Sequence, residues 1–243
     1  MTYHNSGGFD ALTGLQSWLA DEEVRLLLLL GENGTGKTFT ARMFAERILQ
    51  EYDEKKRGYL PLFIDCEKLP KDGTLIQRLD HYCRENVQHD LSILHIREAI
   101  NDGVVVLVLD GFETLLITHP REAVHLWKQI AQFLEGERAK VLVTCRTEFF
   151  ENQAEERRWV GMLNVPSFIW YMQPFTPGQI QEFLERSSRA AKKLRDSLPA
   201  LPQGTILVTL SEPPRNIQGE MTSERVIELV EQAISRTHHT PGI

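Results

Sequence analysis

The octet GENGTGKT, residues 31–38, constrains the fold of this chain more than any other stretch. It follows the apolar run RLLLLL at 25–30 and leads into the amphipathic stretch TFTARMFAERILQEY at 38–52. A glycine-rich turn that joins a buried strand to a helix in this way matches the P-loop pattern G-x-x-x-x-G-K-[ST]. The pattern therefore predicts an α/β fold in which one strand ends at a phosphate-binding turn.

The chemistry of phosphate binding explains the spacing within the octet. Glycines lack a Cβ, so the chain can wrap with successive backbone N–H groups directed at phosphate oxygens, and the next helix points its positive dipole end to the same place. We expect Lys37 to reach the β- and γ-phosphates and the Thr38 hydroxyl to bind Mg²⁺. A glycine-rich turn that binds nothing is the alternative. The predicted nucleotide-binding residues are Gly31, Glu32, Asn33, Gly34, Thr35, Gly36, Lys37 and Thr38.

Short apolar runs alternate with longer stretches of helical period along most of the chain. This alternation is typical of a parallel sheet covered by helices on both faces. It predicts a three-layer α/β/α sandwich around a five-stranded, mostly parallel sheet. The predicted strands are 25–30, 60–65, 104–110, 140–145 and 167–172, and the helical stretches between them include 38–52, 74–86, 90–100 and 121–136.

The chain changes character after the fifth apolar run. FTPGQIQEFLER, 175–186, predicts a helix, and DSLPALPQG, 196–204, has the composition of a linker. A short β-rich run at 205–210 and an amphipathic stretch at 223–236 follow. We therefore predict a P-loop domain over residues 1–196 and a small C-terminal α/β appendage of unknown role over 197–243.

Asp110 ends the run VVVLVLD and is followed by Gly111. An Asp-Gly pair can be a plain turn, or the carboxylate can be half of a metal site. Alternation with the valines before it places Asp110 at the carboxyl end of a buried parallel strand, where α/β sheets bind ligands. Because Mg²⁺ takes only one or two protein oxygens, we interpret Asp110 and Thr38 as the predicted metal ligands.

Hydrolysis of a nucleotide requires two further groups. Glu113, three residues past Asp110 in a loop expected to fold over the phosphate, is the best-placed carboxylate to orient or deprotonate a water. Arg146 follows the run KVLVTC and can contact the γ-phosphate. The predicted catalytic residues are therefore Glu113, Lys37 and Arg146. The alternatives are that Glu113 is a solvated loop acid and that Arg146 is an ordinary surface arginine.

Composition and charge disfavour several other classes of protein. The net charge of −7 and the pI near 5.7 argue against a surface devoted to nucleic acid or acidic lipid, and we interpret the basic run 186–195 as a solvated helix face. Three well-separated cysteines form no C-x-x-C pair, so neither a disulfide framework nor a zinc site is indicated. With no signal sequence and no apolar run of about 20 residues, we expect a soluble, cytoplasmic protein.

Taken together, these segments resemble the NACHT family, within the STAND class of signal-transducing P-loop NTPases. The likeness covers roughly residues 9–190, and it rests on LLLLLGENGTGKT, LPLFIDCEKLP, VLVLDGFETL, VLVTCRTEFF and YMQPFTPGQIQEFL in the family's order. Gly111 directly after Asp110 resembles the NACHT pattern and differs from AAA+-type ATPases, which usually carry a glutamate at that position. The resemblance implies a five-stranded parallel sheet with the P-loop strand at its centre.

The resemblance also implies a function. It implies a Mg²⁺-dependent switch that holds ADP at rest, exchanges it for ATP, and then self-associates or binds a protein partner; ATP is favoured over GTP on the resemblance alone. Thr114 departs from the family by replacing a second acid, and a hydroxyl is no base near neutral pH. Three functions therefore stay open: a slow Mg-NTPase switch, a module that holds nucleotide without turnover, and an ATPase subunit that acts with DNA.

Overall fold

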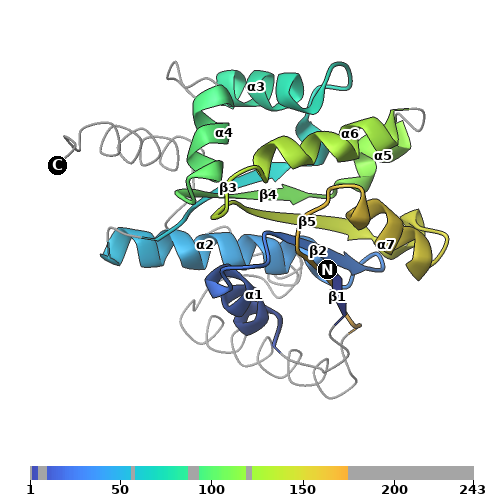
Figure 1. Ribbon diagram of the computed structural model, residues 1–243, viewed down its shortest axis with the longest axis horizontal. Helices are drawn as coiled ribbons and strands as arrows, with labels where there is room; N and C mark the ends of the chain where they lie inside the picture. The colour runs from blue at the N-terminus through green and yellow to red at the C-terminus, as the bar shows by residue number, and fades with distance from the viewer. Residues whose placement is uncertain (1, 5–9, 56–57, 87–92, 119–121, 175–243) are drawn as a thin grey trace, which may run out of the picture. The chain divides into compact units, whose positions relative to one another are not determined.

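The computed structural model describes residues 2–4, 10–55, 58–86, 93–118 and 122–174 of the 243-residue chain. Within them, a parallel sheet lies between two layers of helices, with α1 and α2 on one face and α3 to α7 on the other (Figure 1). This arrangement confirms the three-layer α/β/α sandwich. The helix predicted at 175–186, the boundary near 196 and the appendage 197–243 lie outside the described residues.

All five apolar runs form strands of one parallel sheet. They are β2 (Leu26–Gly31), β3 (Leu60–Asp65), β4 (Val105–Asp110), β5 (Lys140–Arg146) and β6 (Ser167–Tyr171). The order is β1-β6-β2-β5-β4-β3, so the P-loop strand β2 is an interior strand, as the resemblance implied. The sheet also has a sixth strand, β1 (Thr2–His4), which pairs with β6. Sequence reasoning missed it because three residues show no usable alternation.

Seven helices cover the described part of this sheet. Four of them correspond to the predicted helical stretches, although the stretch 121–136 divides into α6 and a 3-10 turn, Ile130–Phe133. Three helices were not predicted: α1, α5 and α7. The helices are α1 (Ala11–Ala20), α2 (Lys37–Lys55), α3 (Leu75–Asn86), α4 (Ile93–Asn101), α5 (Glu113–Thr118), α6 (Ala123–Gln129) and α7 (Gln153–Gly161).

The alternation of side chains along β4 decides which helical layer each one meets. Val105, Leu107 and Leu109 pack in the core that α3 to α7 cover, whereas Val106 and Val108 pack with α1 and α2. Asp110 continues the second set, because successive residues of a strand point to opposite faces. Its carboxylate therefore emerges on the side of the sheet where the P-loop helix α2 lies.

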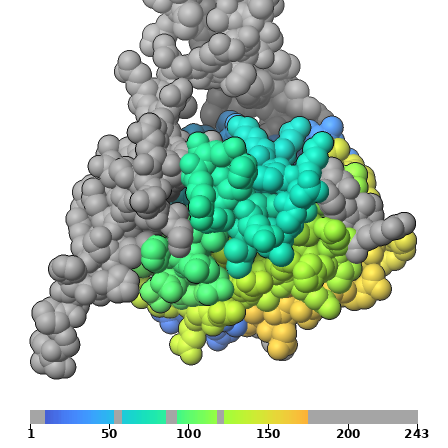
Figure 2. All heavy atoms as spheres, turned by 90° about the horizontal axis from the view of Figure 1, so that it is seen from above, coloured from blue at the N-terminus to red at the C-terminus, as the bar shows by residue number. Residues whose placement is uncertain are grey.

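The layer of α3 to α6 has a closed surface of side chains when it is seen from above (Figure 2). Its large core residues, such as Trp127 and Phe133, are fully buried beneath it. Few large apolar side chains are exposed in the described part of the chain, and the most exposed of them is Phe39 at 68%. No helix among the described residues has the length and apolar character needed to cross a bilayer.

Candidate functional site

The predicted phosphate-binding turn, residues 31–38, joins β2 to α2, and its backbone depends on glycine at three positions. Gly34 and Gly36 have φ angles of 79° and 91°, a region that residues with a Cβ rarely adopt. Gly31 is needed for a different reason, because a Cβ there would lie 2.7 Å from Thr35 Oγ1 and 3.0 Å from Met172 Cβ. The turn therefore has the backbone-defined shape expected of a phosphate cradle.

Lys37 is the first residue of α2 and is only 9% exposed. Its Nζ donates hydrogen bonds to the carbonyl oxygens of Gly31, at 2.7 Å, and Glu32, at 2.8 Å. The ammonium group is thus held inside the turn, close to where a bound phosphate would need positive charge. Thr38 follows at the exposed start of α2, and Glu32 and Asn33 lie on the exposed outer side of the turn.

Asp110 is 4% exposed at the end of β4 and contacts the neighbouring strand β5 through Thr144. Thr144 Oγ1 donates a hydrogen bond of 2.7 Å to Asp110 Oδ1 and accepts one of 2.8 Å from the Gly111 N–H. Sequence reasoning gave Thr144 no role of its own. The contact exists because β5 lies between β2 and β4, and the strand order was not readable from the local pattern.

The predicted metal ligands fit a Mg²⁺ ion shared with phosphate. Asp110 Oδ2 takes no hydrogen bond from the residues that the structure describes, and the Thr38 hydroxyl lies at the exposed helix start on the same side of the sheet. A site of this kind needs only one or two protein oxygens, since Mg²⁺ completes its octahedron with waters and phosphate oxygens. It differs from a metal site built by three or more protein ligands. The described His, Cys, Asp and Glu residues form no site of that second kind.

Glu113 and Arg146, two of the predicted catalytic residues, form an ion pair. Glu113 Oε1 lies 3.0 Å from Arg146 Nε; the glutamate side chain is 6% exposed and the arginine side chain 47%. Glu113 Oε2 is buried and finds no hydrogen-bond donor within the described part of the chain. The structure corrects the expected location, because Glu113 begins helix α5 instead of lying in a loop. It is therefore not a solvated loop acid.

The turn that connects Asp110 to α5 is fixed at several points. Gly111 has a φ of 70° and so requires glycine, while the Phe112 N–H donates to the Thr144 carbonyl at 3.0 Å. The Thr114 hydroxyl donates to the Gly111 carbonyl at 2.8 Å, a local bond back to the residue three positions earlier. Thr114, the residue in place of a second acid, thus has a structural contact of its own.

Two buried thiols lie beside these carboxylates. Burial raises the pKa of the Cys66 thiol well above its usual value, and the negative charge of Asp110 adds to the effect. Burial also raises the pKa of Cys145, together with the charge of Glu113. Both thiols are therefore protonated near neutral pH, and Cys145 is a packed core residue and no activated nucleophile.

A cluster of aromatic rings supports the site from the side of α6 and α7. Phe112, next to Glu113, packs edge-on against Trp127 at 5.6 Å, and Trp127 packs against Trp159 at 5.9 Å. Phe149, which follows the strand end of β5, packs against Trp159 at 5.4 Å. The turns that carry the two members of the ion pair are therefore anchored in one rigid aromatic cluster.

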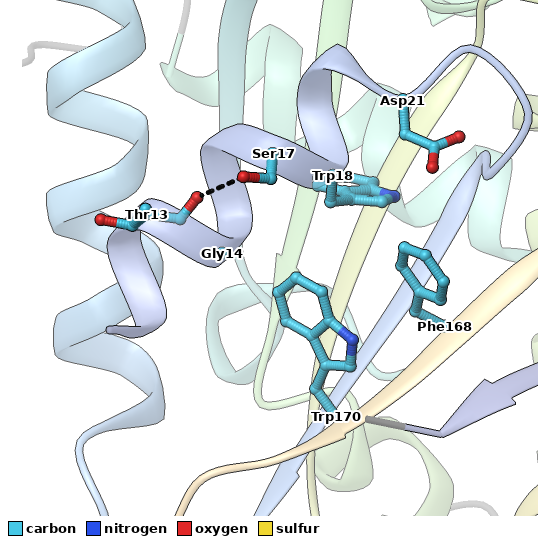
Figure 3. A pocket seen from close by; sticks show the side chains of 7 residues that line it. All are labelled: Thr13, Gly14, Ser17, Trp18, Asp21, Phe168 and Trp170. Atoms are coloured by element: carbon cyan, nitrogen blue, oxygen red, sulfur yellow. Dashed lines mark hydrogen bonds between the residues drawn. The ribbon is translucent and has the colours of Figure 1, made fainter. Parts of the chain in front are cut away.

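A separate cavity of about 320 Å³ lies between α1 and β6 (Figure 3). Two of its aromatic walls, Phe168 and Trp170, stack at 5.6 Å, and on the α1 side Ser17 Oγ donates to the Thr13 carbonyl at 3.0 Å. None of the predicted site residues lines it. The lining residues are Thr13, Gly14, Ser17, Trp18, Asp21, Phe168 and Trp170.

A parallel sheet whose interior strand enters a glycine-rich turn, with an aspartate at the end of a nearby strand, defines the class of P-loop NTPases. The family model of the NACHT domain matches residues 25–191, and the chain belongs to the NACHT family. Membership of this family supports nucleotide binding and NTPase activity in general.

Comparison with individual proteins gives distant relatives. The chain is 30% identical over 152 residues to an uncharacterized WD repeat-containing protein of Nostoc sp., a match that covers 58% of this chain and a tenth (10%) of that protein. Among solved structures, Aeropyrum pernix Orc1 in complex with DNA aligns with a TM-score of 0.50 and 16% identity over 93% of this chain and 64% of Orc1. The Walker-type ATPase PABY2304 of Pyrococcus abyssi aligns with a TM-score of 0.49 and 18% identity, over 94% and 73%.

Proposed function

We propose that this chain binds Mg²⁺ with ATP or ADP, hydrolyses ATP slowly, and works as a STAND-type signalling switch. In this proposal the bound nucleotide controls self-association or the binding of a protein partner. GTP is the second candidate nucleotide, because a P-loop contacts phosphates and leaves the base to other residues. Family membership supports nucleotide binding, whereas the ion pair between the buried Glu113 and the half-exposed Arg146 is the single observation that carries hydrolysis.

The residues of the turn and of the strand ends have separate tasks in this proposal. Lys37 exchanges a carbonyl contact for the β- and γ-phosphate oxygens and neutralises part of their charge. Thr38 and Asp110 hold Mg²⁺, which supplies further positive charge to the transferred phosphoryl group. Arg146, half exposed and already directed at a carboxylate, contacts the γ-phosphate.

Glu113 would act on the attacking water. Its Oε2 is a buried carboxylate oxygen without a donor, and such an atom is costly unless something donates a hydrogen bond to it. A water held there would be oriented by Glu113 and would lose its proton to the same carboxylate during attack. Arg146 keeps Oε1 occupied, so only Oε2 is left for this task.

A module that holds nucleotide without turnover is the competing function, and Thr114 favours it. Its hydroxyl is committed to the Gly111 carbonyl, so Glu113 is the one carboxylate that this turn contributes to the site. The DNA alternative was motivated by the basic run 186–195, which lies outside the described residues. It stays a prediction, and a DNA affinity that does not fall steeply with salt would contradict it.

The decisive experiment examines binding and turnover in one preparation. The purified protein is denatured, the released nucleotide is identified by chromatography, and phosphate release is timed on the undenatured remainder. We expect ADP or ATP in the wild type and a loss of about 10²-fold in affinity in Lys37→Ala, because a buried charge contact is removed. Lys128→Ala, at an exposed position of α6, is the matched control.

Each outcome of this experiment selects one function. Nucleotide retained with slow phosphate release supports the switch that hydrolyses ATP. Nucleotide retained for hours without any phosphate release selects the holding module. A wild-type protein with no affinity for any nucleotide would overturn the proposal altogether, and equal binding by wild type and Lys37→Ala would contradict the role of the P-loop.

A further inference from the structure

We infer that Thr144 is a positioning residue that orients Asp110 toward bound Mg²⁺. The inference rests on the proposed function, because it concerns the same nucleotide site. Thr144 lies at the position of β5 next to Asp110, because the register pairs Leu109 with Val143 and these two are the residues that follow them. The two side chains are 1% and 4% exposed, so water does not compete with their contact.

The donor and the acceptor of each hydrogen bond at the Thr144 hydroxyl can be assigned. A hydroxyl has a single proton, and Thr144 donates it to Asp110 Oδ1 at 2.7 Å. Its oxygen in turn accepts the Gly111 N–H at 2.8 Å. The resulting chain runs from the backbone amide through the hydroxyl to the carboxylate, and each bond in such a chain polarises the next.

This chain determines which oxygen of Asp110 faces the ligand. The last side-chain torsion of an aspartate is broad, so nothing in the residue itself fixes the rotation of its carboxylate. The bond from Thr144 holds Oδ1 against β5, and Oδ2 is the oxygen that no described donor engages. A carboxylate fixed in this way meets Mg²⁺ without first losing rotational freedom, which is the role of the outer contacts of many metal ligands.

The backbone of Thr144 allows the hydroxyl to be tested by itself. The Phe112 N–H donates to the Thr144 carbonyl at 3.0 Å, and the strand pairing of β5 with β2 involves only main-chain atoms. Thr144→Val therefore removes the hydroxyl while it keeps the shape of the side chain and these backbone bonds. Thr144→Ser keeps the hydroxyl and is the matched control.

The experiment measures how nucleotide affinity depends on Mg²⁺. A fluorescent ATP analogue is titrated against wild type, Thr144→Val and Thr144→Ser at a series of Mg²⁺ concentrations and in EDTA. We expect the half-saturating Mg²⁺ concentration to rise about 10- to 100-fold in Thr144→Val, the usual effect of losing an outer contact of a metal ligand. Thr144→Ser should stay near wild type, and affinity in EDTA should be equal in all three proteins.

A purely structural role for Thr144 gives a different result. It would lower affinity equally with Mg²⁺ and in EDTA, or leave the Mg²⁺ dependence unchanged, and either result overturns the inference. If wild type binds no nucleotide under any condition, the proposed function fails instead. If Thr144→Val does not fold, Thr144→Cys takes its place, since a thiol is a much weaker donor than a hydroxyl.

A double-mutant comparison provides an independent check. In an Asp110→Asn background, which removes the negative charge that Mg²⁺ needs, the Thr144→Val change should have no further effect on the Mg²⁺ dependence. Residues that act through one another show this kind of non-additivity. Two fully additive effects would show that Thr144 does not act through Asp110, and would overturn the inference.

Discussion

The buried polar groups at the two ends of strand β5 differ in their hydrogen bonding. At the amino end, Lys140 is 2% exposed, and its Nζ donates to the carbonyls of Trp18 at 3.1 Å, Val24 at 2.6 Å, and Asp21. Every proton of that ammonium group has an acceptor. The Trp18 ring lies 5.5 Å from the same nitrogen.

The carboxyl end of β5 is different. Arg146 is half exposed, and Glu113 Oε2 has no donor within the described residues. The amino end, complete in the sense that each Lys140 ammonium proton is bonded, connects α1 to the sheet. The carboxyl end, incomplete because Glu113 Oε2 has no donor, lies beside the P-loop strand. Burial of a charged group is therefore a weak indicator of a functional site. A buried polar atom that has no hydrogen-bond partner and lies next to a phosphate-binding turn is a stronger one.

The largest expected effect is on turnover at the incomplete end. Glu113→Gln keeps the shape of the side chain and an oxygen for Arg146, but an amide cannot accept a proton from water. Phosphate release should fall by about 10²- to 10⁴-fold while nucleotide affinity and unfolding free energy stay close to wild type. Glu148→Gln, an exposed position just past the same strand, is the control. Equal rates in wild type and Glu113→Gln would remove Glu113 from the mechanism.

At the complete end, stability should change and nucleotide binding should not. Lys140→Met removes the donor from carbonyls that are buried between α1 and the sheet. The unfolding free energy at pH 7, measured by urea titration, should fall by about 1 to 3 kcal/mol, the usual cost of leaving buried polar groups unpaired. Lys128→Met on the surface of α6 should change little. A loss of nucleotide affinity in Lys140→Met would break the distinction between the two ends.

A substitution in the P-loop, beside the incomplete end, tests whether nucleotide binding depends on the backbone conformation of this turn. Gly36→Ala places a Cβ at a φ of 91°, which strains the turn by about 1 to 2 kcal/mol and should lower nucleotide affinity about 10-fold. Gly161→Ala is the matched control, because nothing lies within 4 Å of an added Cβ there. Isothermal titration calorimetry measures both variants. Similar affinities for Gly36→Ala and Gly161→Ala would show that ligand binding tolerates a different turn.

The smallest expected effect is the contribution of Lys140 to the pH dependence of stability. Burial lowers the pKa of Lys140 from 10.5 to about 8. Between these two values Lys140 binds more protons in the unfolded chain than in the folded one, so its contribution to the unfolding free energy rises with pH, by at most about 1.4 kcal/mol per unit. Below pH 8 the cost of burying the charge is fully present. The difference in unfolding free energy between wild type and Lys140→Met, followed by urea titration from pH 7 to pH 10, should show this slope, because the buried thiols contribute equally in both proteins. Parallel curves would contradict it.

Sequence reasoning predicted those features that depend on local rules. The octet 31–38 requires glycine because of its own φ angles, and the five apolar runs are buried because each is apolar along its length. Glu113 was recognised as a candidate but placed in a loop, since α5 has only six residues and shows no helical period. The local sequence pattern identifies these residues but does not determine which residues they contact in the fold.

The contacts between strands could not be predicted in the same way. Thr144 meets Asp110, 34 positions away in the sequence, only because β5 lies between β2 and β4. The one signal for Thr144 was a hydroxyl residue near the carboxyl end of the apolar run that precedes Arg146. Lys140 gave no signal at all, because a lysine at the start of a strand is ordinarily solvated.

The strand order also affects how the chain folds during synthesis. Strand β2 and its phosphate-binding turn are synthesised more than a hundred residues before β5 and β6, the partners of β2 in the sheet. Pairings between such distant segments form slowly and leave strand edges exposed in the meantime. A nucleotide can stabilise only the folded form, so it cannot protect the growing chain until residue 171 has been added. Strand β2 and the P-loop that follows it therefore lack their two neighbouring strands during this interval of synthesis.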